Sequence, residues 1–93
     1  MRTWNDYKLY VEENDPEMYK DIKETEKIAE IITAMIKQRN ALGLSQRDLA
    51  NLCSIPQSSV ARIESCKTMP TIGMLLNILE HLGLNLTVSR TAE

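Results

Sequence analysis

The chain has 93 residues and a formal net charge of −2, and its length predicts a single domain. It lacks both an apolar run of about 18 residues and a basic-then-apolar N-terminal signal, so we expect a cytoplasmic protein with no membrane partner. Its two cysteines and one histidine lack metal-ligand spacing, and no catalytic constellation stands out. We therefore expect no metal, no cofactor and no enzyme activity, with Cys53 as a small buried residue.

Charge is distributed unevenly along the chain. Residues 1–30 carry nine acidic and five basic side chains, whereas residues 31–93 carry four acidic and six basic ones. A slightly negative protein is an unusual nucleic-acid binder, but this asymmetry predicts two surfaces with different partners.

Two helices are predicted in the first half of the chain. Residues 2–13 form the first, and its aromatic side chains lie close to one face: Trp4, Tyr7 and Tyr10. Asp15 is an N-cap for a second helix that begins with Pro16 and ends at Gly43. The polar segment 23–27 could mark a kink or a break in that helix.

Two very short helices follow, separated by a tight turn. Ser45 caps the first, whose apolar stripe is predicted to point inward: Leu49, Leu52 and Cys53. Pro56 opens the second as its first residue.

The C-terminal part begins with a helix capped by Thr71 and ending at Gly83. Residues 84–89 then alternate apolar and polar side chains, a pattern that predicts a short β-strand. The apolar residues of this strand are Leu84, Leu86 and Val88. Because the strand has no partner in its own chain, we expect it to pair with the same strand of a second subunit and form a homodimer.

The helix that begins at Pro56 has two distinct faces. At about 100° per residue, Val60 and Ile63 face the core with Ser59 beside them. The outward arc contains Gln57, Ser58, Ala61 and Arg62. Small residues with an amide and a guanidinium suit a helix that enters the major groove of DNA, although an ordinary solvated face has the same composition. Gln46, which opens the preceding helix, favours the DNA interpretation because a helix N-terminus can bind a phosphate.

The segment containing LGLSQ, DLA and PQSSVARIE resembles the helix-turn-helix domain of the Cro/C1-type (xenobiotic-response-element) repressors, from about residue 25 to residue 84. The resemblance implies an all-α, lambda-repressor-like bundle with an N-terminal helical extension and the short C-terminal strand. We expect the extension at residues 1–24, the DNA-binding domain at 25–83, and the strand and tail at 84–93.

The resemblance also implies roles for individual residues. The expected DNA contacts are Gln46, Arg47, Gln57, Ser58, Ser59, Arg62 and Lys67. Arg39 and Glu64 correspond to a structural ion pair of the family. The chain departs from the family pattern at Ser54, where a glycine is usual in the turn, and at residues 65–66, where Asn-Gly is usual.

The overall layout looks like a HigA-type antitoxin. That resemblance implies repression of its own operon as a dimer on double-stranded DNA, at a palindromic operator, and neutralisation of a small basic toxin, an mRNA-cleaving ribonuclease. Aromatic residues are preferred interface anchors, so the expected partner contacts are Trp4, Tyr7 and Tyr10. Two alternatives remain: the rings pack on their own domain, or the protein is a stand-alone phage-like or metabolic repressor without a toxin.

Overall fold

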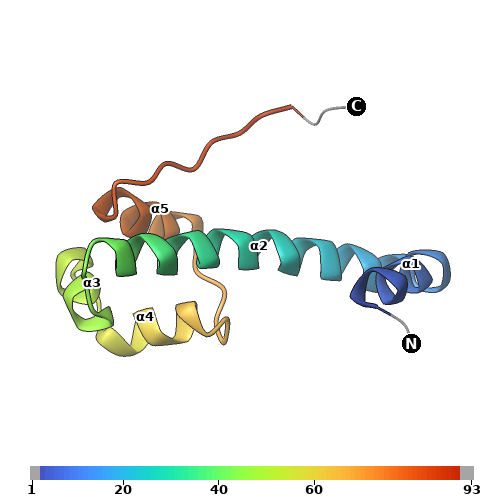
Figure 1. The fold of residues 1–93 in the computed structure, drawn as a ribbon, viewed down its shortest axis with the longest axis horizontal. Helices are drawn as coiled ribbons and strands as arrows, with labels where there is room; N and C mark the ends of the chain where they lie inside the picture. Colours follow the sequence, from blue (N-terminus) through green and yellow to red (C-terminus); the bar gives the residue numbers. More distant parts are fainter. Residues whose placement is uncertain (1–2, 91–93) are drawn as a thin grey trace. The chain divides into compact units, whose positions relative to one another are not determined.

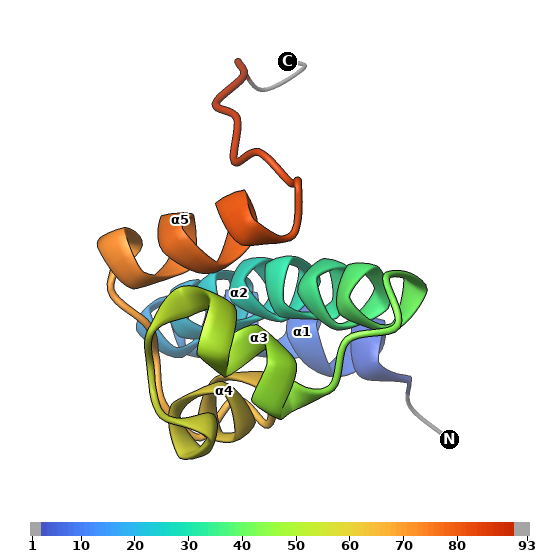
Figure 2. The same ribbon diagram turned by 90° about the vertical axis from the view of Figure 1, so that its left-hand side faces the viewer.

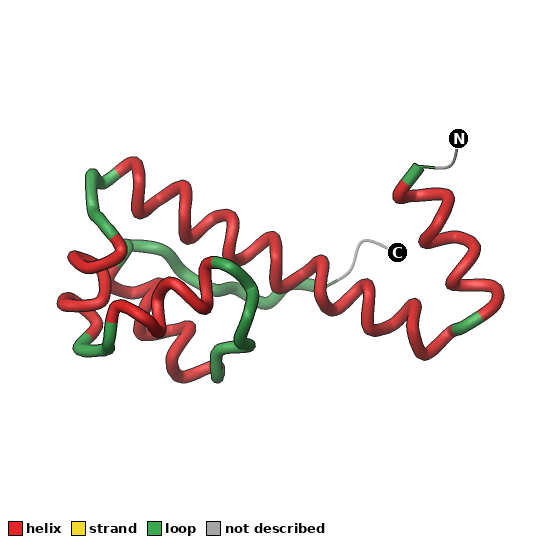
Figure 3. Tube along the Cα trace, turned by 90° about the horizontal axis from the view of Figure 1, so that it is seen from below, coloured by secondary structure: helices red, strands yellow, loops and turns green. Residues whose placement is uncertain are grey.

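A computed structural model describes residues 3–90 of the chain, which form five α-helices and no strand (Figures 1 and 3). The helices are α1 (Trp4–Asn14), α2 (Pro16–Ala41), α3 (Gln46–Cys53), α4 (Gln57–Glu64) and α5 (Ile72–His81). The chain divides into two compact units, Met1–Ile31 and Ile32–Glu93, and the boundary between them falls within α2.

Three of the predicted helix starts are confirmed by their capping bonds. The Asp15 carboxylate accepts a 3.1 Å bond from the N–H three residues on, at the start of α2. Ser45 and Asp48 form a capping box on α3, in which each side chain accepts a bond from the other residue's N–H, at 3.0 and 2.9 Å. The Thr71 hydroxyl accepts a 3.1 Å bond in the first turn of α5. Each bond satisfies an N–H that has no partner inside the helix.

Helix α2 runs without a break through the polar segment 23–27. Lysine and glutamate are good helix formers, so a polar stretch does not interrupt the backbone hydrogen bonds. The end of α2 follows the prediction, because Gly43 has a left-handed φ of 72°.

Two non-glycine residues close the turns on either side of α4. Ser54 has φ 57° and ψ 43°, and Cys66 has φ 60°. These are positions where the family that the sequence resembles usually has glycine, and an L-residue in this conformation is strained by about 1 kcal/mol. The prediction that Pro56 is the first residue of α4 is wrong by one position, because Pro56 is the N-cap and the helix begins at Gln57; Pro56 makes no side-chain capping bond.

Helices α3, α4 and α5 pack with the end of α2 in the second unit. Helices α4 and α5 lie on opposite sides of the C-terminal part of α2, which belongs to this unit (Figures 1 and 2). The largest fully buried side chains of this core are Met35, Leu49, Val60, Ile78 and Leu82. Cys53 is buried as predicted, but the inward placement of Leu52 is wrong, because 48% of that residue is exposed.

Two side-chain amides connect the helices of this unit. Gln38 on α2 donates a 2.9 Å bond to the carbonyl of Leu82 after α5. Asn77 on α5 donates a 3.1 Å bond to the carbonyl of Cys53 at the end of α3. Both bonds satisfy helix-end carbonyls that lack intrahelical partners, and they hold α2, α3 and α5 in register.

The predicted C-terminal β-strand is wrong. Within residues 84–90 no residue is in a strand, and Figure 3 draws the described part of this segment as a loop. An alternating sequence becomes a strand only when a neighbouring strand satisfies its N–H and C=O groups, and the described part of this chain supplies no such neighbour. Leu84 is half-buried, whereas Leu86 and Val88 are 42% and 98% exposed. Their contribution to a dimer interface stays a prediction.

Candidate nucleic-acid interface

Helix α4 presents a polar face to solvent. Gln57, Ser58 and Arg62 are exposed, while Val60 and Ile63 on the opposite face are buried. None of the three exposed side chains makes a hydrogen bond within residues 3–90, so their donors and acceptors are available to a ligand. The arrangement provides one amide, one hydroxyl and one guanidinium on a slender helix, the groups that read base edges in a major groove.

The other expected DNA contacts surround this face. Ser59 lies half-buried on α4 itself. Arg47 on α3 and Lys67 in the loop after α4 are both exposed, and neither forms an ion pair within the described residues. Together with Arg62, they are three cationic side chains of the second unit that form no ion pair within residues 3–90, in a unit of low overall charge. Their binding to phosphates and bases stays a prediction.

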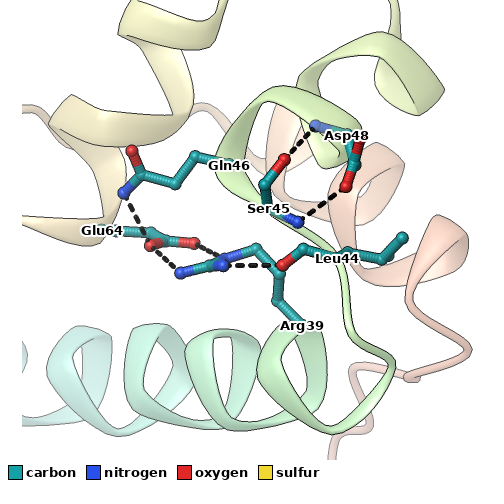
Figure 4. Close-up of polar contacts among 6 residues, drawn as sticks. All are labelled: Arg39, Leu44, Ser45, Gln46, Asp48 and Glu64. Carbon is teal, nitrogen blue, oxygen red and sulfur yellow. Dashed lines mark hydrogen bonds and ion pairs between the residues drawn. The ribbon is translucent and has the colours of Figure 1, made fainter.

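The Glu64 carboxylate, at the end of α4, is the centre of a polar network (Figure 4). It accepts bonds from Arg39 Nε at 2.7 Å and Arg39 Nη2 at 2.9 Å. The same guanidinium donates through Nη1 to the Leu44 carbonyl at 2.8 Å. The side chains of Arg39 and Glu64 are only 12% and 6% exposed. Bonding to Glu64 raises the pKa of Arg39 above its ordinary value, and the pair joins the end of α2 to the end of α4.

Gln46 is the third member of this network. Its Nε2 donates to Glu64 Oε1 at 3.0 Å (Figure 4), so the amide nitrogen is already bonded in the free protein. Sequence reasoning missed this contact, because nothing in the local pattern predicts which side chain reaches Glu64 from a different helix. The amide nitrogen has a second N–H that can donate to a phosphate while the bond to Glu64 stays in place, and the backbone N–H groups at the start of α3 are further phosphate donors.

The first unit contains the expected partner-binding aromatics. Trp4, Tyr7 and Tyr10 are 53%, 41% and 59% exposed. The rings of Trp4 and Tyr7 stack with centroids 5.6 Å apart and an interplanar angle of 24°. Tyr10 extends from the same helix. The structure thus leaves a large part of each ring uncovered by its own unit.

Within residues 3–90, no group of histidine, cysteine or acidic side chains has the arrangement of a metal site. No helix of that part combines the length and apolar composition needed to cross a bilayer.

Comparison with known proteins identifies the family. The helix-turn-helix family model matches residues 35–88, more than half of the chain, and this range includes α3, α4 and α5. The chain belongs to the Cro/C1-type helix-turn-helix family. The all-α bundle observed in the second unit agrees with this assignment.

Two relatives extend the comparison beyond that domain. An uncharacterized HTH-type transcriptional regulator from Haemophilus influenzae is 31% identical over 85 residues, which are 91% of this chain and 82% of the relative. A chain of a toxin-antitoxin module from Streptococcus pneumoniae has a TM-score of 0.72 and 28% identity, covering 98% of this chain and 96% of the other. This helix-turn-helix protein is therefore a DNA-binding transcriptional regulator, and its family is not a family of enzymes.

Proposed function

We propose that this regulator is the antitoxin of a type II toxin–antitoxin pair, which neutralises a ribonuclease toxin and represses its own operon as a homodimer. The observation that carries the proposal is the match to a chain of a toxin-antitoxin module, because it spans 98% of this chain and so includes the first unit as well as the DNA-binding fold. The exposed aromatic rings of α1 support a protein-binding role for that unit.

The DNA-binding half of the proposal rests on α4. Gln57, Ser58 and Arg62 contact base edges, while Gln46, Arg47 and Lys67 position the helix on the phosphates. Ser59, half-buried at the edge of this face, completes the contact surface. A two-fold homodimer binds a palindromic operator with half-sites about one helical turn apart.

The test of DNA binding uses the region upstream of the gene and two arginine variants. Arg62→Ala should lose about 1–3 kcal/mol of operator binding and relax base selectivity, as expected for a bidentate base contact. Arg90→Ala is the matched control, because it removes the same charge from an exposed residue outside the helix-turn-helix. If Arg62→Ala binds the operator as tightly and as selectively as the wild type, α4 is not the reading helix.

The test of neutralisation is growth of cells that express the small reading frame next to this gene. Growth should stop when that frame is expressed alone, and co-expression of the wild-type regulator should restore it. The Trp4→Ala/Tyr7→Ala variant should fail to restore growth, whereas Ile72→Ala, which changes a 72% exposed residue of the second unit, should succeed. A harmless neighbour, or none, would favour the alternative of a stand-alone phage-like or metabolic repressor.

A further inference from the structure

The first unit contains an apolar groove that DNA binding does not use. Trp4 of α1 and the side chains of Met18, Ile22 and Ala29 on α2 line it, with a cavity volume of about 430 Å³. That volume is within the range of pockets that hold a small molecule or bulky side chains. The polar residues of its lining are Asp21, Thr25 and Glu26. We call these seven residues the tryptophan groove.

The indole wall of the groove is held in place before any partner binds. Trp4 Nε1 donates to Glu26 Oε2 at 3.1 Å, and the ring stacks on Tyr7. Glu26 in turn accepts bonds from Lys8 Nζ at 2.9 and 3.2 Å, and these bonds, more than that from Trp4, lower the pKa of the Glu26 carboxyl. A preorganised wall reduces the ordering cost of binding, while Trp4 remains 53% exposed. The side chain is therefore both fixed and accessible.

The charges around the groove are predominantly acidic. At about 100° per residue, the groove-lining positions 18, 22, 25 and 29 form one stripe of α2. Three exposed acidic residues flank that stripe on one side: Glu17, Asp21 and Glu24. None of them forms an ion pair within residues 3–90. The lysines of the same part of α2 fall on its opposite face: Lys20, Lys23 and Lys27.

We infer that the tryptophan groove binds an amphipathic cationic segment of a protein partner. A bulky apolar side chain of that segment packs against Trp4 and Ile22, and a lysine or arginine beside it pairs with Asp21. The apolar lining supplies the burial energy, and the acidic flank selects a basic segment and disfavours anionic ones, including nucleic acid. This inference rests on the proposed role of the first unit in binding a basic partner protein.

The chain contains one tryptophan, so its fluorescence reports directly on the groove. The probes are two synthetic amphipathic helices with identical leucines, one with lysines and one with glutamates on the polar face. The full chain is titrated with each. The lysine peptide should shift Trp4 emission to shorter wavelength in a saturable titration, because it covers the exposed indole. The glutamate peptide should produce no saturable shift.

Paired variants test the location of binding. Met18→Ala, which truncates a 42% exposed groove residue, should weaken binding of the lysine peptide about tenfold, as expected for a side chain that becomes a buried interface anchor. Leu9→Ala is its control, since Leu9 is 60% exposed on α1 outside the groove. Asp21→Lys should weaken binding by a similar factor. Glu13→Lys is its control, because Glu13 lies outside the groove, and this variant should change binding less than threefold at 0.15 M salt, where exposed charges are screened beyond about 8 Å.

Several results would overturn the inference. They are a glutamate peptide that binds as well as the lysine peptide, no saturable shift with either peptide, or equal losses in the groove variants and their controls. Circular dichroism of each variant separates a lost contact from lost folding. The titration uses neither the operator nor a toxin. A failed titration would therefore contradict this inference without contradicting a positive growth rescue. A failed growth rescue would contradict the proposed function without changing what the titration shows.

Discussion

The Arg39–Glu64 pair allows a quantitative prediction about the stability of the second unit. Replacing Glu64 with leucine removes the acceptor of three N–H donors, two from Arg39 and one from Gln46. The Arg39 guanidinium, 12% exposed, would keep only its bond to the Leu44 carbonyl. Breaking a buried ion pair from one side costs about 3–5 kcal/mol. The free energy of unfolding of a typical domain is about 5–15 kcal/mol, so we expect Glu64→Leu to remove a large share of the stability of the second unit.

A double variant distinguishes the contribution of the ion pair from the cost of leaving one buried charge without its partner. Arg39→Met/Glu64→Leu removes both charges and fills the site with apolar atoms, so it should be far more stable than either single variant. We would therefore expect a coupling energy of about 2–3 kcal/mol in a double-mutant cycle. Urea unfolding followed by circular dichroism is the appropriate assay, because Trp4 lies in the other unit and its fluorescence would report on that unit instead.

Glu80→Leu is the matched control, since Glu80 is exposed on α5 and forms no ion pair within the described residues. It should change the free energy of unfolding by less than about 0.5 kcal/mol. The reasoning is refuted if Glu64→Leu costs less than about 1 kcal/mol, the value of a solvent-screened surface pair. It is equally refuted if the two single losses add in the double variant, because the two side chains would then not be coupled.

Three further predictions follow from local geometry. Ser54→Gly should raise the free energy of unfolding by about 0.5 kcal/mol, because relief of the left-handed strain outweighs the added entropy of the unfolded chain; urea unfolding measures this. The hydrogen bond from the Ser45 backbone N–H lowers the pKa of the Asp48 carboxyl. The stabilisation of the folded state by this carboxylate is therefore present above the unfolded pKa of about 4 and is lost as pH falls through the lower folded pKa. When unfolding is measured over a pH series, the stability of Asp48→Asn should approach that of the wild type below about pH 4. A thiol reagent should modify exposed Cys66 quickly and Cys53 slowly, because burial raises the pKa of Cys53, and mass spectrometry after brief exposure distinguishes the two.

Each of these has a contradicting outcome. A destabilised Ser54→Gly variant would mean that the serine side chain contributes more than the strain removes. A constant difference between Asp48→Asn and the wild type from pH 7 to pH 3 would mean that the capping carboxylate titrates alike in both states. Equal modification rates for the two cysteines would mean that α3 opens readily.

Local chemistry in the sequence was sufficient to predict the starts of α2, α3 and α5. Ser45 and Thr71 cap helices through bonds that span three residues, so the relevant partners are always near in the chain. The outward arc of α4 follows from the helical repeat alone, and its exposed face contains Gln57, Ser58 and Arg62 as that repeat predicts. Periodicity and capping need no knowledge of distant residues, which is why they can be read from the chain.

Only the tertiary structure decided features that depend on distant neighbours. Gln46 reaches Glu64 across 18 positions in sequence, and Leu52 stays exposed although its spacing fits an apolar stripe. The alternating tail lacks a strand because a ladder requires a second strand, which the described part of the chain does not provide. The tryptophan groove also needs two helices folded against each other, because its wall depends on the bond from Trp4 to Glu26, 22 positions away. Sequence patterns specify which residues share a face, but packing determines what that face meets.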